Sequence, residues 1–232
     1  MKRRWKNHLR MFWKGWGCSL FVALVIATSF KSAIADWNVV PTGSMKPTLV
    51  EGDRIFVNKL AYDLKIPYTT LHIAEWCEPK RGDIVVFYSP ADGERLVKRV
   101  VGIPGDSVSM RNNRVVLNGK RLRYEAIQHL RADDPSSGGD ADTYRLWENL
   151  GEAPHPIWIS PGHPAPRSFG PVTVPEESYL VLGDNRDNSA DSRYFGFLRR
   201  SRIVGRADFI VVSLDINDNY KPRWERFFTD LP

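Results

Sequence analysis

Short runs of apolar and β-branched residues, many with an apolar residue at every second position, recur along the chain beyond residue 31. Such runs are typical of β-strands, whose successive side chains point to opposite faces of a sheet. No long stretch after Lys31 has apolar residues at the 3.6-residue spacing of a helix. The pattern therefore predicts a mainly β domain, with strands at residues 54–60, 83–88, 95–101, 107–111, 114–118, 179–182 and 203–213.

Turn-forming residues divide this β region into a main part and an insertion. Asn112-Asn113 and Asn118-Gly119 predict a hairpin around residues 107–118. Residues 124–171 are instead rich in Asp, Ser, Gly and Pro, and predict loops with one short helical turn near residues 144–150. We expect a main β domain formed by residues 36–119 and 172–232, and a smaller loop-rich second lobe at 120–171.

The N-terminus has a different pattern, an apolar run that follows a basic segment. Between Lys14 and Lys31 lie 16 residues, which as a helix rise about 24 Å against the roughly 30 Å of a hydrocarbon core. Lysine side chains that extend toward the headgroups can make up this difference. Because basic flanks stay cytoplasmic, we expect a cytoplasmic segment at 1–14, a single transmembrane anchor at 15–35 and the rest outside. A cleavable signal peptide ending at Ala33-Ile34-Ala35 is the alternative.

Charge and cysteine content exclude several classes of function. The net charge of +6 comes from the first 35 residues, which hold seven basic and no acidic residues. The remaining 26 basic residues face 27 acidic residues, a net charge of −1, so we expect no nucleic-acid partner. Cys18 and Cys77 are too few for a disulfide framework, and the absence of a CxxC pair gives no support for a zinc site.

Ser44 is the first candidate for chemistry, because it lies between Gly43 and Met45-Lys46-Pro47, in a segment that cannot be regular helix. A tight turn presents the hydroxyl and the backbone N–H of one serine toward the same point. Thr42 adds a second hydroxyl that could join this N–H in an oxyanion hole. Taken alone, a serine in a turn is usually a surface hydrogen-bonding group.

Lys98 is the second candidate, because it lies within the apolar strand of residues 95–101. Alternation places Leu96, Lys98 and Val100 on one face. Burial among apolar neighbours lowers a lysine pKa, and the neutral amine can take a proton from a serine hydroxyl. Arg99 cannot do so, since a guanidinium stays protonated. The competing interpretation is a lysine that points to water from an edge strand.

A dense polar loop at residues 183–193 is the third feature. Ser189 could orient a neutral lysine amine, and Asp191 could pair with Arg193 within the loop. A calcium loop fits poorly, because the central glycine and the distal glutamate of such loops are missing. A loop with a purely structural role is the other interpretation.

Taken together, these segments resemble the serine, lysine and Gly-Asp-Asn-Arg-Asp-Asn-Ser boxes of bacterial type I signal peptidases. In this order and spacing the boxes are highly specific, unlike single motifs. The matched boxes cover about residues 38–119 and 172–213. The segments that carry the resemblance are 41–49, 52–59, 81–87, 96–106 and 183–193.

The resemblance implies a signal-peptidase-like β catalytic domain and a membrane-bound serine endopeptidase. In this reading Ser44 is the nucleophile, Lys98 is the general base, and Thr42 with the Ser44 N–H forms the oxyanion hole. Ser189 orients Lys98, while Asp191 and Arg193 support the loop. No metal or organic cofactor is implied. The small side chains of an extended substrate would lie against an apolar surface, for which we select Val40, Met45, Leu49, Val86, Leu96 and Val97.

The expected substrates are preproteins with N-terminal signal peptides, cut after small-x-small sites such as Ala-x-Ala on the outer face of the bacterial cytoplasmic membrane. The lipid bilayer is the other expected partner, and the sequence does not give an oligomeric state. One alternative is a specialised relative that matures one or few substrates of a conjugation or secretion system. From a different class, a catalytically inactive, membrane-tethered β scaffold stays open, although a scaffold needs none of Ser44, Lys98 and Ser189.

Overall fold

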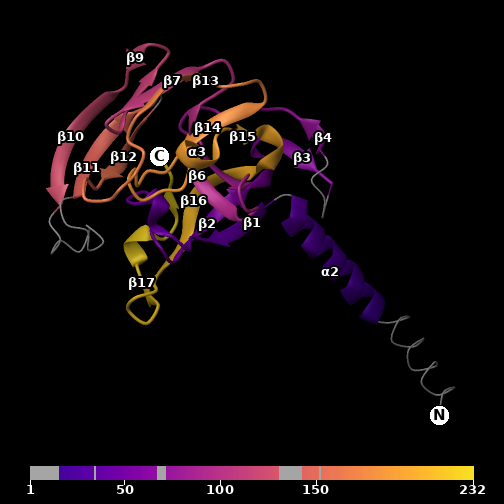
Figure 1. Ribbon diagram of the computed structural model, residues 1–232. Coiled ribbons are helices and arrows are strands. Elements are labelled where there is room, and N and C mark those ends of the chain that lie inside the picture. Colours follow the sequence, from indigo (N-terminus) through magenta and orange to yellow (C-terminus); the bar gives the residue numbers. More distant parts are fainter. Residues whose placement is uncertain (1–15, 34, 67–71, 131–142, 152) are drawn as a thin grey trace.

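The computed structural model describes residues 16–33, 35–66, 72–130, 143–151 and 153–232 (Figure 1). Helix α2 (Trp16–Ala33) precedes the β domain and has 18 residues, a rise of about 27 Å. Among the described residues, no helix is both long enough and apolar enough to cross a membrane. The predicted transmembrane anchor at 15–35 is therefore not supported, and the predicted cytoplasmic segment, 1–14, lies outside the described residues. Ala35, which we assigned to the anchor, instead begins strand β1 (Ala35–Val39).

The prediction of a mainly β domain is confirmed. The largest sheet has nine strands and runs in the order β1-β2-β16-β5-β6-β14-β15, with β17 and β18 paired to β16. Five of its strands fall on the predicted runs, namely β2 (Asp53–Asn58), β5 (Ile84–Tyr88), β6 (Arg95–Gly102), β14 (Ser178–Leu182) and β16 (Ile203–Asp215). The short strands are β15 (Leu198–Arg199), β17 (Lys221–Pro222) and β18 (Thr229–Asp230).

A four-stranded sheet in the order β13-β7-β8-β9 contains the predicted hairpin. Its β7 (Ser107–Arg111) and β8 (Arg114–Leu117) are antiparallel and joined at Asn112-Asn113. Both asparagines have positive φ, as does Asn118 before Gly119, so the turn residues adopt the left-handed conformation that asparagine and glycine tolerate. The sheet is completed by β9 (Lys120–Arg121) and β13 (Phe169–Thr173).

The segment after this hairpin differs from our prediction. Its described part contains a three-stranded antiparallel sheet of β10 (Arg123–Leu130), β11 (Thr143–Asn149) and β12 (Pro154–Ile159). The helical turn expected near residues 144–150 is wrong, because this segment is strand β11. Leu146 and Glu148 are buried in alternation with the exposed Trp147, and a glutamate at a core-facing position hid the strand periodicity. The Asp/Ser/Gly run at 133–140 lies outside the described residues.

Three hydrophobic clusters make up the core. One contains Val40, Met45, Leu49 and Ile55, a second contains Val85, Phe87, Val100 and Tyr179, and a third lies under β7 and β8 around Val108. A separate two-stranded sheet is formed by β3 (Asp63–Lys65) and β4 (His72–Glu75), and Lys65 Nζ donates to the carbonyl of Ile203 in the second cluster. Strand β6 therefore runs between clusters, and its polar side chains enter the interior.

Candidate active site

Ser44 lies in the 3-10 helix η1 (Gly43–Met45), whose Met45 is buried in the first hydrophobic cluster. Asn185, in the polar loop at residues 183–193, holds this turn in place. Its Nδ2 donates to the Gly43 carbonyl at 3.0 Å, and its backbone N–H donates to the Ser44 carbonyl at 3.1 Å. Two hydrogen bonds from one residue fix the position of the turn relative to the loop, although the two segments are more than 140 residues apart in sequence.

The side chain of Lys98, on β6, ends beside this turn. Its Nζ lies 2.6 Å from Ser44 Oγ and 3.0 Å from the Val97 carbonyl oxygen. The predicted proximity of amine and hydroxyl is thus present in the structure. Leu96 and Val100 pack in the second cluster, as strand alternation predicts, whereas Val97 packs against the first.

Burial determines the protonation state of Lys98. The side chain is 2% exposed, and this desolvation lowers its pKa from 10.5 to about 8. Asp191 and Asp184 oppose the shift, while Arg193 adds to it. With a pKa of about 8, about one tenth of the amine is neutral at pH 7 and half is neutral at pH 8. A neutral amine within hydrogen-bond distance of a hydroxyl can accept its proton.

The structure also brings Asp191 and Arg193 together in the polar loop. Arg193 Nε lies 2.8 Å from Asp191 Oδ1, and Arg193 Nη2 lies 2.7 Å from Asp191 Oδ2. Asp191 caps the short helix α3 (Ser192–Phe195) by accepting from the Arg193 N–H, and also accepts from the Gly183 N–H. This carboxylate therefore closes the loop by binding both of its ends.

Ser189 is buried in this loop, but it does not make the predicted hydrogen bond to Lys98. Among the described residues its Oγ has no hydrogen-bond partner. Gly183 brings the loop against the serine turn, since a Cβ there would lie 2.2 Å from Ser189 Oγ and 2.5 Å from the Ser44 carbonyl oxygen. Only glycine allows this approach without a shift of the main chain.

Thr42 is exposed and precedes η1 as its N-cap residue, without a side-chain capping bond. Its hydroxyl is therefore not used to cap the turn that carries Ser44. The N-cap backbone is extended, with φ of −135°, so Thr42 needs no strained conformation to stand beside the turn.

Most of the residues selected for an apolar substrate surface are in the core. Four of them are at most 3% exposed and lie in the first cluster, against which Val97 also packs, and Leu96 packs against the second cluster. The selection therefore does not form one surface, because Leu96 faces away from the other five. The four buried members are Val40, Met45, Leu49 and Val86.

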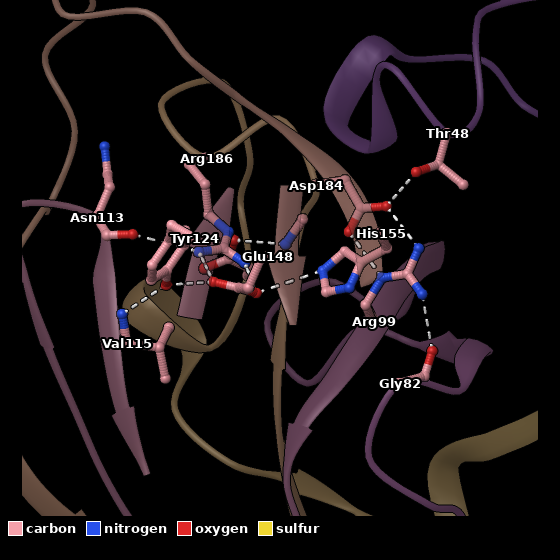
Figure 2. A network of polar contacts seen from close by, with 12 residues as sticks. Thr48, Gly82, Arg99, Asn113, Val115, Tyr124, Glu148, His155, Asp184 and Arg186 are labelled. Atoms are coloured by element: carbon pink, nitrogen blue, oxygen red, sulfur yellow. Dashed lines mark hydrogen bonds and ion pairs between the residues drawn. The ribbon is translucent and has the colours of Figure 1, made fainter. Parts of the chain in front are cut away.

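A buried ion pair lies next to Lys98 on β6 (Figure 2). Arg99 donates from Nε and Nη2 to the two carboxylate oxygens of Asp184 at 2.9 and 2.8 Å, and both side chains are 1% exposed. Thr48 donates to the same carboxylate, and Arg99 also binds the Gly82 carbonyl. Burial alone would raise the pKa of Asp184, but the Arg99 guanidinium keeps it below its ordinary value.

A second buried group continues from this pair into the three-stranded sheet. Figure 2 shows Glu148 between Arg186, Tyr124 and His155, with hydrogen bonds from Arg186 and Tyr124. His155 Nε2 lies 3.3 Å from Glu148 Oε2, without the alignment of a hydrogen bond. Burial opposes ionisation of Glu148, yet the Arg186 guanidinium holds its pKa well below the usual range. Burial and the Arg99 charge lower the pKa of His155.

These groups connect the three-stranded sheet to the serine turn. The Trp158 N–H of β12 donates to the Asp184 carbonyl at 2.8 Å, and the Arg186 N–H donates to the Trp158 carbonyl at 2.9 Å. Asn185, which binds η1, therefore lies between Asp184 and Arg186, whose backbone groups are hydrogen-bonded to Trp158 of β12. Sequence reasoning gave no role to Asn185, Arg186 or Glu148. The first two lie in a recognisable box, but no signal near Glu148 marks it as buried.

Within the described residues, no group of three or more His, Cys, Asp and Glu side chains is placed to hold a metal ion. The arrangement as a whole combines a hydroxyl, a buried amine of lowered pKa and a polar loop held by several ion pairs. It is suited to proton transfer between Ser44 and Lys98.

Comparison with known proteins gives a consistent result. Residues 13–212 match the model of the family described as signal peptidase, peptidase S26. Signal peptidase I of Pseudomonas fluorescens is 36% identical over 204 residues, which cover 83% of this chain and 70% of that protein. Signal peptidase I P of Bacillus subtilis subsp. natto is 32% identical over 201 residues, covering 86% and 89%. A crystal structure of a signal peptidase I from Enterococcus faecalis V583 is 32% identical, with a TM-score of 0.35 over 56% of this chain and 97% of that one.

Proposed function

The chain belongs to the signal peptidase family, peptidase S26, and on this premise we propose that Ser44 and Lys98 are the catalytic pair with which it cleaves signal peptides from exported preproteins. The single observation that supports this assignment most is the 2.6 Å contact between Lys98 Nζ and Ser44 Oγ. The low exposure of Lys98 supplies the physical reason for a neutral amine.

In the first half of the reaction, Ser44 Oγ attacks the scissile carbonyl carbon while its proton moves to Lys98 Nζ. The C–N bond then breaks, and the Lys98 ammonium returns the proton to the leaving amine, which leaves the signal peptide as an ester on Ser44. In the second half, Lys98 takes a proton from water as the water attacks the ester. The Ser44 oxygen leaves and regains that proton.

The negative charge of the tetrahedral intermediates requires donors that point to one place. We assign this role to the Ser44 N–H and the Thr42 hydroxyl, because Thr42 precedes the turn and its side chain does not cap it. Asp191 and Arg193 hold the loop that faces Lys98. Ser189 is buried beside Gly183 with an unused Oγ, and we assign it the orientation of the amine after a small rotation of either side chain.

We propose that a preprotein binds in extended form and is cut after a small-x-small sequence, with its small side chains near Val97, which is only partly buried where it packs against the first cluster. We assign catalysis to residues 36–119 and 172–232, with 120–171 as a second lobe. Within that lobe, β12 supports the site through residues 184–186.

We further propose that the N-terminal segment attaches the domain to the cytoplasmic membrane, with the catalytic part outside. Large apolar side chains of α2, including Leu20, Phe21 and Leu24, are exposed, and the segment before it is basic. Carbonate extraction of membranes from cells that make the intact protein tests this attachment. Recovery of a soluble mature chain beginning at Asp36 would contradict it.

Cleavage of a purified preprotein with an Ala-x-Ala site tests the catalytic pair. Ser44→Ala and Lys98→Ala should fold but lose cleavage by at least about a thousandfold. Lys65→Ala is the matched control, because burial also lowers the pKa of Lys65, whereas its Nζ donates to the Ile203 carbonyl rather than to a hydroxyl. Cleavage by Lys98→Ala at the rate of Lys65→Ala would refute the assignment.

A further inference from the structure

Three arginines lie on one face of the β13-β7-β8-β9 sheet. Strand pairing places Arg111 opposite Arg114, and Val116 between Ser109 and Arg121. Because side chains alternate along strands, Ser109, Arg111, Arg114, Val116 and Arg121 share a face. The opposite face, with Val108, Met110 and Val115, is buried in the third cluster. The arginine face therefore points away from the core.

This face is hollowed into a groove of about 900 Å³. The arginines line it together with Ser109, Ser168 and Phe169, and none of its lining residues is acidic. No ion pair joins Arg111, Arg114 or Arg121 to a carboxylate in the described part of the chain. The Arg114 guanidinium lies 4.4 Å from the centre of the Tyr124 ring, which fixes its position without neutralising it.

Placing Arg111 directly opposite Arg114 costs stability, because like charges at a cross-strand pair repel one another. The chain beyond residue 35 has a net charge of only −1. The three arginines are therefore a local concentration of positive charge in a domain that is not basic overall. Three unpaired guanidinium groups around one groove are suited to several carboxylates, since each guanidinium can donate two parallel hydrogen bonds.

We propose that this groove binds an acidic segment of another polypeptide. Figure 1 places β7, β9 and β13 at the end of the molecule opposite α2, and therefore away from the segment with the exposed apolar helix. This position favours a polypeptide over lipid headgroups. The near-neutral charge of the domain disfavours a long nucleic acid, which needs an extended basic surface. The proposal does not depend on the assignment of Ser44 and Lys98.

Fluorescence anisotropy with the full chain in detergent tests the proposal, using a labelled peptide of eight glutamates and a peptide of eight glutamines. The glutamate peptide should bind at low ionic strength, and added salt should weaken it. The double variant Arg111→Gln/Arg121→Gln should weaken binding by at least about fivefold. The control Arg54→Gln/Arg199→Gln removes two exposed charges elsewhere and should bind like the wild type.

Two further readouts separate a binding surface from a general charge effect. Arg111→Gln should raise the melting temperature by about one degree while it weakens peptide binding, because it removes the repulsion with Arg114. Equal weakening by the two double variants would overturn the proposal. So would a groove variant that keeps its affinity for the glutamate peptide but loses binding to phosphatidylglycerol vesicles or to single-stranded DNA.

Discussion

Replacing Glu148 with glutamine leaves Arg186 as a buried cation without a counterion. Glu148 is 0% exposed and Arg186 is 1% exposed, and the two form a bidentate pair in which Arg186 Nη1 lies 3.0 Å from Glu148 Oε1. Removing one partner of a buried pair costs about 3–5 kcal/mol, because the other charge stays desolvated. Glutamine can still accept one hydrogen bond, so we expect the lower end, about 3 kcal/mol.

For a domain of this size, a loss of about 3 kcal/mol lowers the melting temperature by about 6–12 °C. Circular dichroism measures this change, and the exposed pair of Lys221 and Asp218 supplies a control. Asp218→Asn should change the melting temperature by no more than about 1 °C. In Glu148→Gln, preprotein cleavage below the melting transition should also fall, because Arg186 adjoins the residue that holds the serine turn. A wild-type melting temperature in Glu148→Gln would refute the reasoning.

Three further outcomes follow from the site. Gly183→Ala should lose cleavage by at least about a hundredfold, because the added Cβ would overlap Ser189 and the Ser44 carbonyl. The control Gly162→Ala has open space around it and should cleave normally. Normal cleavage by both variants would contradict the close approach of Gly183 to the serine turn. Since the pKa of His155 is lowered in the folded protein, the stability that depends on its neutral form is present above about pH 6.5 and declines as the pH falls below it. In His155→Gln, the melting temperature should decline less steeply as the pH falls below about 6.5. An unchanged slope of melting temperature against pH would exclude His155 as the source of the decline. Thr42→Ser should keep cleavage, while Thr42→Ala should lose about a hundredfold in kcat; equal rates would remove Thr42 from the oxyanion hole.

The strands of the main sheet could be predicted from sequence, because their β-branched residues face hydrophobic clusters on at least one side. Strand β16, for example, begins at Ile203 in both the prediction and the structure. Strand β11 could not be predicted in this way, since its core-facing positions include Glu148, whose burial depends on a guanidinium from residue 186. Periodicity cannot show a polar residue that is buried by pairing with a distant partner.

For the candidate site, likewise, the roles of some residues could be predicted from sequence and those of others could not. Ser44 and Lys98 could be selected because a serine in a tight turn and a lysine within an apolar strand occur together with the other boxes in a specific order and spacing, although neither feature is decisive alone. Asn185 could not be given its role, because its two hydrogen bonds reach the serine turn across more than 140 residues. The predicted bond from Ser189 to Lys98 is absent among the described contacts, and the position of the serine depends on how closely Gly183 approaches the turn.

The pH dependence of single-turnover preprotein cleavage tests the catalytic pair most directly. If Lys98 is the base, the rate should rise with pH through an apparent pKa of about 8, since the neutral amine is the active form. The wild type should therefore cleave about five times faster at pH 8 than at pH 7. A rate that does not change between about pH 6.5 and pH 9, with chemistry shown to be the slow step, would contradict a neutral Lys98 amine as the base for Ser44.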